Sequence, residues 1–218
     1  MFINQRISTS VLIGLGLICT SHSLADTTKD TELNTVTIIG TDEDLSTLAG
    51  SATRIDETMI SEFDSTDLND LLTRTPGVYI RYEDGYGLRP NIGIRGVTSD
   101  RSQKITLMED GVLISPAPYT APAAYYIPNV NRMQNIEVVK GPAAIQHGPH
   151  TIGGAINMIT RPAPYEAEGS LDLTYGSDNY HKGRVQFGDT PDSLGGQWGY
   201  HLDLMSYGAD GFKELDNG

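Results

Sequence analysis

The stretch that decides the fold is Arg132-Met-Gln-Asn-Ile-Glu-Val-Val-Lys-Gly-Pro-Ala-Ala-Ile-Gln-His-Gly-Pro-His-Thr-Ile-Gly-Gly-Ala-Ile-Asn-Met-Ile-Thr-Arg161. Its first apolar run contains Ile136, Val138 and Val139, and its second runs from Ala155 to Ile159. A Gly-Pro break, a short apolar segment and a glycine-rich turn separate the two runs. Short apolar runs bounded by glycine and proline predict two strands joined by an irregular link.

Two more segments extend this pattern toward the amino terminus: Asn91-Ile-Gly-Ile-Arg-Gly96 and Ile105-Thr-Leu-Met-Glu-Asp-Gly-Val-Leu-Ile114. Together with the first stretch they resemble the plug domain of TonB-dependent outer-membrane receptors, which import scarce nutrients into Gram-negative cells. The resemblance runs from about Thr35 to Arg161. It implies a transporter in which a plug domain fills a transmembrane β-barrel.

Residues 1–25 are expected to be an export signal. Arg6 supplies a positive start, Val11 to Cys19 is an apolar run, and Ala25 is a small residue suited to cleavage. A membrane anchor is the alternative, but the run is too short to cross about 30 Å of hydrocarbon. Cleavage removes Cys19, the only cysteine, so the exported chain can form no internal disulfide.

The chain carries a formal net charge of −13. Neutralisation of phosphates supplies most of the affinity of proteins for nucleic acids, so this charge argues against a nucleic-acid partner. Ordinary solubility is another consequence of the same charge.

Residues 26–44 are expected to form a flexible amino-terminal segment. Asp26 to Leu33 is polar, and a β-branched run follows it. The resemblance implies that this run is the TonB box, which pairs with the periplasmic protein TonB as an added strand. The alternative is a strand of the plug itself. The run consists of Thr35, Val36, Thr37, Ile38 and Ile39.

Residues 45–164 are expected to form the plug domain. A helix is predicted from Asp67 to Thr73, capped by Ser65 or Thr66 and ended by Pro76-Gly77, because its leucines share one helical face. An Asp-Gly pair predicts a tight hairpin at Asp110-Gly111. Strands are expected at Val78–Tyr82, Ile92–Arg95, Lys104–Met108 and Val112–Ile114.

After Pro164 the apolar and polar residues alternate, in Ser170–Tyr175, Gly183–Phe187 and Trp198–Tyr207. Alternation is typical of strands with lipid on one side, although a soluble antiparallel sheet with one wet face has the same period. The predicted fold is therefore an α+β plug domain followed by the first antiparallel strands of a transmembrane β-barrel, in residues 165–218. A barrel of this family needs about 22 strands, so the chain is expected to be a fragment of a larger plugged barrel.

The sequence predicts no catalytic residue, no metal site and no cofactor, and hence no enzyme. Glu109 and Asp110 are neighbours on a strand and point to opposite faces. His147 and His150 flank a Gly-Pro pair that prevents a regular helix between them, and the sequence places no cysteine near them.

Two arginines are expected to touch the barrel. The resemblance implies that Arg95 and Arg132 pair with glutamates on the barrel wall, because directional guanidinium–carboxylate pairs hold a plug that must later loosen. Two solvated or strand-capping arginines are the alternative. The expected ligand loops are Tyr86 to Asn91 and Ala117 to Tyr126, in which Arg89 is the sole cation. The ligand candidates are Arg89, Asn91, Tyr119, Tyr125 and Tyr126.

The cargo is expected to be a ferric chelate. Gly93-Ile-Arg-Gly96 and Pro116-Ala-Pro-Tyr119 resemble receptors of the ferric dicitrate type. Ala121 and Ala123 replace glutamines of that type, which leaves citrate or another siderophore open. The predicted function is TonB-dependent transport across outer-membrane lipid into the periplasm. Alternatives are another cargo such as cobalamin or a sugar, a secreted binding module, and a non-functional truncated receptor.

Overall fold

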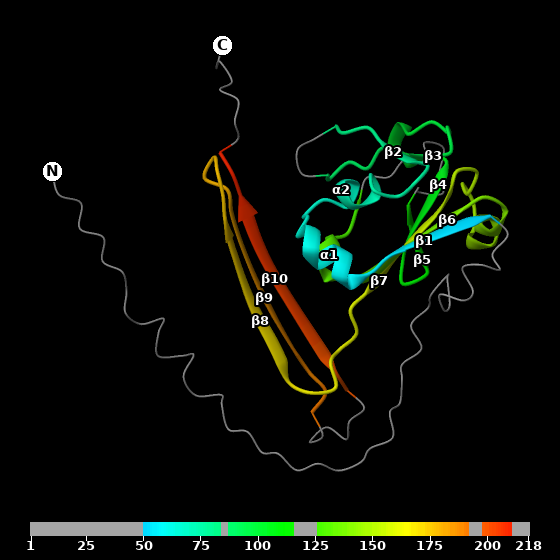
Figure 1. Ribbon diagram of the computed structural model, residues 1–218. Coiled ribbons are helices and arrows are strands. Elements are labelled where there is room, and N and C mark those ends of the chain that lie inside the picture. Colours follow the sequence, from blue (N-terminus) through cyan, green and yellow to red (C-terminus); the bar gives the residue numbers. More distant parts are fainter. Residues whose placement is uncertain (1–49, 84–86, 116–125, 192–197, 211–218) are drawn as a thin grey trace, which may run out of the picture. The chain divides into compact units, whose positions relative to one another are not determined.

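The computed structural model describes residues 50–83, 87–115, 126–191 and 198–210 (Figure 1). The chain divides into two units, Met1–Asn34 and Thr35–Gly218, and every described residue belongs to the second. The expected export signal and TonB box, as well as Tyr119 and Tyr125, lie outside the described residues. Across the described part of the chain, no helix has both the length and the apolar character needed to cross a membrane.

A five-stranded sheet forms the centre of an α+β domain that extends from Ser51 to Thr160. Its order is β1-β6-β7-β4-β5, and only the β4–β7 pair is parallel. The fold-deciding stretch forms β6 and β7, two of the three inner strands, with Val138 opposite Ile156. The strands are β1 (Ser51–Ile55), β6 (Met133–Lys140), β7 (Gly154–Thr160), β4 (Ile105–Glu109) and β5 (Val112–Ser115).

The link between β6 and β7 depends on glycines at its turns. Gly141 (φ 97°) precedes the 3₁₀ helix η4 (Pro142–His147), and Gly148 (φ 107°) follows it. At the start of β7, a Cβ on Gly154 would lie 2.4 Å from the carbonyl oxygen of Val139. A residue with a side chain would be strained by the positive φ and would clash at this close approach. The predicted irregular link is therefore confirmed, and its glycines explain its course.

Two short helices pack on one face of the sheet. Helix α2 (Leu68–Leu72) begins where Asp67 accepts a hydrogen bond from the Asn69 N–H, so the expected caps Ser65 and Thr66 are wrong. Its leucines are buried, as predicted. Helix α1 (Glu57–Phe63) was not predicted, and Asp56 caps it.

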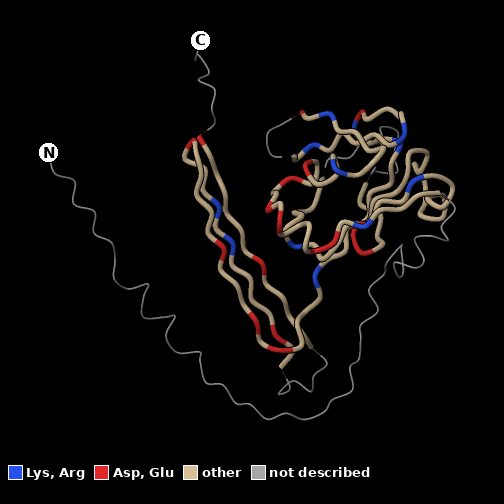
Figure 2. The backbone as a smooth tube through the Cα atoms, viewed as in Figure 1, with Lys and Arg blue, Asp and Glu red and all other residues tan. Residues whose placement is uncertain are grey.

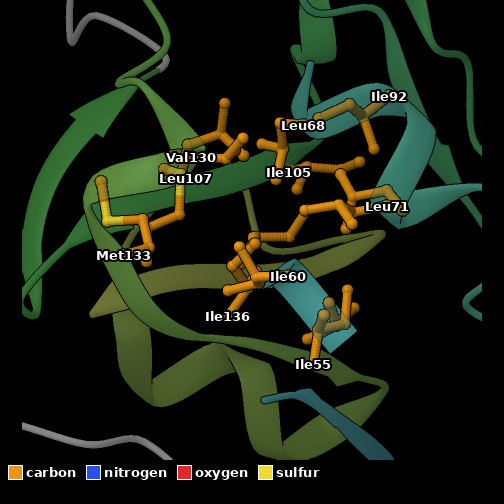
Figure 3. Packing of buried hydrophobic residues seen from close by; sticks show 14 of the residues in the cluster. Ile55, Ile60, Leu68, Leu71, Ile92, Ile105, Leu107, Val130, Met133 and Ile136 are labelled. Carbon is orange, nitrogen blue, oxygen red and sulfur yellow. The ribbon is translucent and has the colours of Figure 1, made fainter. Parts of the chain in front are cut away.

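The main core lies between these helices and the sheet. Figure 3 shows its side chains converging from the helices, β3, β4 and β6. All of its buried members fall between Ile55 and Met158, so none comes from the strands after Pro164. The labelled members are Ile55, Ile60, Leu68, Leu71, Ile92, Ile105, Leu107, Val130, Met133 and Ile136.

A small two-stranded sheet and a hairpin complete this domain. Strand β2 (Val78–Ile80) pairs antiparallel with β3 (Ile92–Ile94). The predicted Asp-Gly hairpin joins β4 to β5, and both turn residues have positive φ, 49° at Asp110 and 78° at Gly111. The Asp110 carboxylate also accepts hydrogen bonds from Thr160, which fixes the hairpin against β7.

The alternating segments after Pro164 form a separate antiparallel sheet in the order β10-β9-β8. Its strands are β8 (Glu168–Tyr175), β9 (His181–Asp189) and β10 (Tyr200–Gly208), so Trp198 precedes the strand it was expected to join. Leu171, Val185 and Leu204 stand side by side across the three strands and are exposed. The predicted α+β domain followed by antiparallel strands is thus confirmed.

Candidate functional site

The ligand candidates Arg89 and Asn91 lie on the loop that enters β3, where folding adds two arginines from elsewhere in the chain. Arg81 follows β2, and Arg101 lies in the 3₁₀ helix η2 (Asp100–Ser102). Figure 2 shows basic and acidic positions close together on the loops around β2 and β3. We call Arg81, Glu83, Arg89, Asn91, Asp100 and Arg101 the arginine cluster. Arg81 and Arg101 lie outside the two loops that the sequence predicted for the ligand, in which Arg89 is the sole cation.

Asn91 holds the cluster together from the inside. Its side chain is fully buried. Its Oδ1 accepts from the Arg101 N–H at 2.9 Å and from Arg81 Nη2 at 3.4 Å. Its Nδ2 donates to Glu83 Oε2 at 2.9 Å and to the Arg89 carbonyl at 3.3 Å. Because its donor and acceptor capacity is used within the protein, Asn91 positions the arginines and is not exposed for ligand contact.

Glu83 is the carboxylate at the centre of the cluster. Its Oε1 accepts from Arg101 Nη2 at 2.8 Å and lies 3.5 Å from Arg89 Nη1. The hydrogen bond from Asn91, with the charges of Arg101 and Arg89, lowers the pKa of Glu83 against the opposing effect of desolvation. Glu83 is therefore ionised at neutral pH.

The backbone of η2 is held in an uncommon conformation. Arg101 (φ 47°) and Ser102 (φ 53°) both lie in the left-handed region without being glycine. The buried Ser102 hydroxyl donates to the Pro90 carbonyl at 2.9 Å and accepts from the Ile92 N–H at 3.0 Å. Such strain persists where surrounding contacts enforce it, and it often occurs at functional positions. Here the side chain of Arg101, one of these two residues, contacts Glu83.

The cluster has the chemistry of an anion-binding surface. It contains three guanidinium groups and two carboxylates, those of Glu83 and Asp100. Arg81 and Arg89 each expose 60% of their side chains. Guanidinium groups bind carboxylates through paired, directional hydrogen bonds. Tyr126, the third tyrosine candidate, is exposed.

The two arginines expected at a barrel wall have neighbours within the α+β domain. Arg132 forms an ion pair with Glu109 at the end of β4. Arg95 is exposed, has a positive φ of 53°, and lies beside Gly141 and Lys140. Burial, and then the charge of Arg95, lowers the pKa of Lys140, whose Nζ donates to the Pro76 carbonyl at 2.9 Å. The contact of Arg95 and Arg132 with barrel glutamates stays a prediction.

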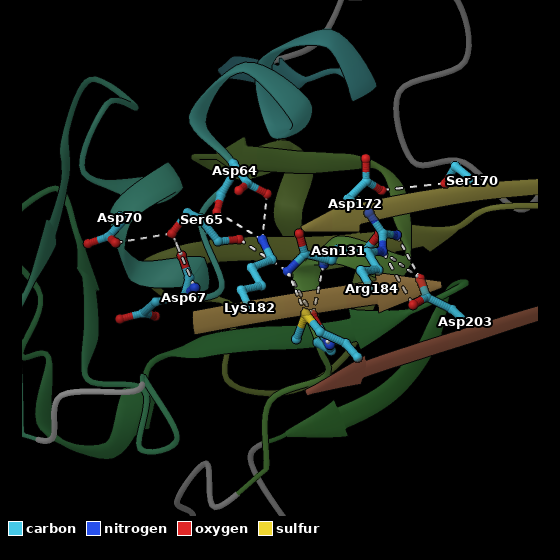
Figure 4. Close-up of polar contacts among 12 residues, drawn as sticks. Asp64, Ser65, Asp67, Asp70, Asn131, Ser170, Asp172, Lys182, Arg184 and Asp203 are labelled. Carbon is cyan, nitrogen blue, oxygen red and sulfur yellow. Dashed lines mark hydrogen bonds and ion pairs between the residues drawn. The ribbon is translucent and has the colours of Figure 1, made fainter. Parts of the chain in front are cut away.

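The polar face of the three-stranded sheet makes ionic contacts that the sequence did not predict. Figure 4 shows Lys182 of β9 reaching the carboxylate of Asp64, the residue that ends α1. Arg184 pairs with Asp203 at 2.6 Å and donates to the Asn131 carbonyl. Alternation predicted that Lys182 and Arg184 share one face of the sheet. It could not predict their partners Asp64 and Asn131, which lie more than fifty positions away in the sequence.

No three His, Cys, Asp or Glu side chains gather as metal ligands in the part of the chain that the structure describes.

Comparison with known proteins agrees with this architecture. The family described as TonB-dependent Receptor Plug Domain matches residues 44–155, about half of the chain. Among solved structures, the unliganded ferric citrate transporter FecA is similar at 27% identity with a TM-score of 0.63. The match covers 78% of this chain and 27% of that one.

Two other solved structures share the fold at lower identity. The ferric preacinetobactin receptor BauA from Acinetobacter baumannii is 24% identical with a TM-score of 0.62, and the match covers 80% of this chain and 25% of BauA. The alcaligin outer membrane receptor FauA from Bordetella pertussis is 18% identical with a TM-score of 0.60, covering 75% and 27%. The chain thus spans about a quarter of the length of the structures that it matches.

Proposed function

Because the chain belongs to the TonB-dependent receptor plug domain family, we propose that it serves in the TonB-dependent transport of an anionic ferric chelate, such as ferric citrate or another siderophore complex, across the outer membrane. The chelate binds first, and energy from TonB then releases it into the periplasm. Similar structures include a ferric citrate transporter and a ferric preacinetobactin receptor. The protein is thus a transporter and not an enzyme.

The observation that carries the cargo proposal is the arginine cluster. Arg89 and Arg101 pair with Glu83, Arg81 pairs with the neighbouring Asp100, and Arg81 and Arg89 are well exposed. A ferric complex of a polycarboxylate carries negative charge on several oxygens, and such oxygens suit guanidinium donors. Attraction in a confined vestibule is also stronger than in bulk water.

The three-stranded sheet supports an outer-membrane location. Leu171, Leu173, Val185, Leu202 and Leu204 are exposed on its apolar face. The opposite face carries Lys182, Arg184 and Asp203 in contact with one another or with the α+β domain. Apolar side chains toward lipid and polar ones inward are the pattern of a membrane barrel, which we propose these strands begin.

The segment that binds the partner TonB is the predicted TonB box. Thr35 to Ile39 combines β-branched residues with a position ahead of β1, which suits an extended segment that adds a strand to a partner sheet. Arg95 and Arg132 are proposed to face barrel glutamates during this process.

The cargo proposal is tested by the binding of ⁵⁵Fe-citrate to iron-starved cells that lack other ferric citrate receptors. Arg101→Gln removes the guanidinium that forms an ion pair with Glu83. This variant is expected to bind ferric citrate about two- to tenfold more weakly. Arg74→Gln is the matched control, because Arg74 is exposed and stacks on Phe63 away from the cluster. Binding by Arg101→Gln at the wild-type level would remove the cluster from the ligand site. If the cells take up cobalamin or an oligosaccharide but no ferric chelate, the proposal of a ferric cargo is wrong.

A further inference from the structure

The arginine cluster already contains a carboxylate in the position that a carboxylate ligand would take. Glu83 Oε1 accepts from Arg101 and lies near Arg89, while Oε2 accepts from Asn91 at 2.9 Å. Both oxygens of the side chain are therefore engaged. An external carboxylate that binds Arg101 Nη2 must compete with Glu83 for it.

Arg101 is prepared for such an exchange. Its backbone is fixed by the strained η2 turn and by the bond from its N–H to Asn91. Its Nη1 is buried and has no hydrogen-bond partner among the described residues. A buried donor without a partner is costly, so an acceptor that reaches this nitrogen gains an interaction that Glu83 does not supply.

Arg81 differs from the other two arginines. It pairs with Asp100 at 3.2 Å, not with Glu83. Its Nη2 also donates to Asn91 Oδ1 at 3.4 Å, but its ion pair is with Asp100, so Arg81 serves as a reference within the same molecule for the loss of the Glu83 ion pairs.

We infer that Glu83 is a specificity-determining residue, an internal carboxylate that holds Arg101 and Arg89 until a multidentate anion displaces it. The inference rests on the proposed anionic cargo. A tethered carboxylate competes at a high effective concentration, so a ligand with one carboxylate gains little by replacing it. A polycarboxylate replaces the Glu83 contact and adds others. Glu83 thus lowers affinity for all anions and selects for those with several charged oxygens.

The test measures how fast phenylglyoxal modifies each arginine of the purified protein, with peptide mass spectrometry as the readout. Glu83→Gln keeps a carbonyl for Asn91 but removes the charge that holds Arg101. We expect Arg101 to react about two- to fivefold faster in this variant and Arg81 to react at the wild-type rate. Glu57→Gln is the matched control, since it breaks the Glu57–Arg161 pair outside the cluster.

Competition is then measured with two iron-free probes, citrate and acetate. We expect citrate to protect Arg101 in both proteins, at a two- to fivefold lower concentration in Glu83→Gln, roughly the value of an exposed ion pair. Acetate should protect Arg101 in Glu83→Gln but not in wild type. Raising the salt concentration should reduce these differences, because exposed charges are screened.

Each outcome decides one of the two proposals. Equal citrate protection in wild type and Glu83→Gln, or no protection in either, overturns the role of Glu83. Protection as expected, with no ferric chelate taken up by cells, leaves Glu83 as the internal competitor and overturns the transport proposal. If Glu83→Gln does not fold, as judged by circular dichroism, Glu83→Ala replaces it in the same assays.

Discussion

At the scale of single residues, Asn91 shows how a loop residue can matter without touching a ligand. It is buried, and it bonds the backbone of Arg101 on one side and the carboxylate of Glu83 on the other. Buried side-chain networks of this kind fix the geometry of the groups around them. The geometry of the arginine cluster therefore depends on a residue that is itself buried.

We predict that Asn91→Asp loosens the arginine cluster. The variant keeps the acceptor for Arg101 but places a carboxylate against Glu83, where Asn91 Nδ2 now donates. Leaving buried polar groups unpaired costs about 1–3 kcal/mol, so the free energy of unfolding should fall by that amount in denaturant titrations. Asn179→Asp, in the turn before β9, is the control. An unchanged free energy of unfolding for Asn91→Asp would contradict this network.

His147 supplies a second prediction at this scale, one that concerns pH. Burial lowers the pKa of His147, and the nearby Glu137 opposes this only in part. A lowered folded-state pKa means that the stabilising contribution is present above the ordinary pKa and is lost as the pH falls through the folded value. The free energy of unfolding should thus decrease between pH 7 and 5, and less steeply in His147→Gln. His181→Gln, an exposed control, should follow wild type.

At the scale of elements, the long apolar strands were predictable and the short half-polar elements were not. β6, β7 and α2 were identified from runs of apolar residues at strand or helix spacing. β1 reads Ser-Ala-Thr-Arg-Ile, and only Ile55 in it is buried. Helix α1 buries only Ile60. A single buried residue gives no periodicity in the sequence. These two elements are instead determined by tertiary contacts: β1 pairs with β6, and α1 packs Ile60 into the core.

The candidate site was predictable only in part for a related reason. Arg89 and Asn91 were identified because they lie together in one loop. Glu83 joins them from the segment after β2 and Arg101 joins them from η2, and the Glu83–Arg101 pair spans 18 positions. Sequence spacing carries no signal for a contact that arises from the pairing of β2 with β3 and the turn at Ser102.

The predicted TonB box yields a test at the scale of elements. Strand addition uses backbone N–H donors, and proline lacks this donor. Ile38→Pro is therefore expected to abolish energised ⁵⁵Fe-citrate uptake while surface binding stays at the wild-type level. Thr31→Pro, in the polar segment just before it, should leave uptake intact. Normal uptake by Ile38→Pro cells would show that this run is not the segment that TonB engages.

At the scale of the whole molecule, the division of the buried residues suggests two parts with different solvents. Both groups of buried apolar residues lie between Ala52 and Met158. The strands after Pro164 instead expose leucines on one face, while the other face carries the buried Lys182 and the Arg184–Asp203 pair. A protein that keeps its core in one part and exposes apolar side chains in the other is suited to a lipid boundary around the second part.

We therefore predict that residues 45–164 fold without the remainder of the chain. The segment contains every member of both buried groups, so the hydrophobic contribution to folding is complete within it. It should give a dispersed amide NMR spectrum and a cooperative but shallow thermal transition, because the surface that Lys182 and Arg184 contact is left open to water. Leu71→Ala removes a fully buried side chain and should lower the free energy of unfolding by about 2–5 kcal/mol. Leu88→Ala, at an exposed position, is the control and should have little effect. A collapsed amide spectrum for the unsubstituted segment would mean that the α+β domain needs the strands after Pro164 to fold, and that the two parts form one cooperative unit.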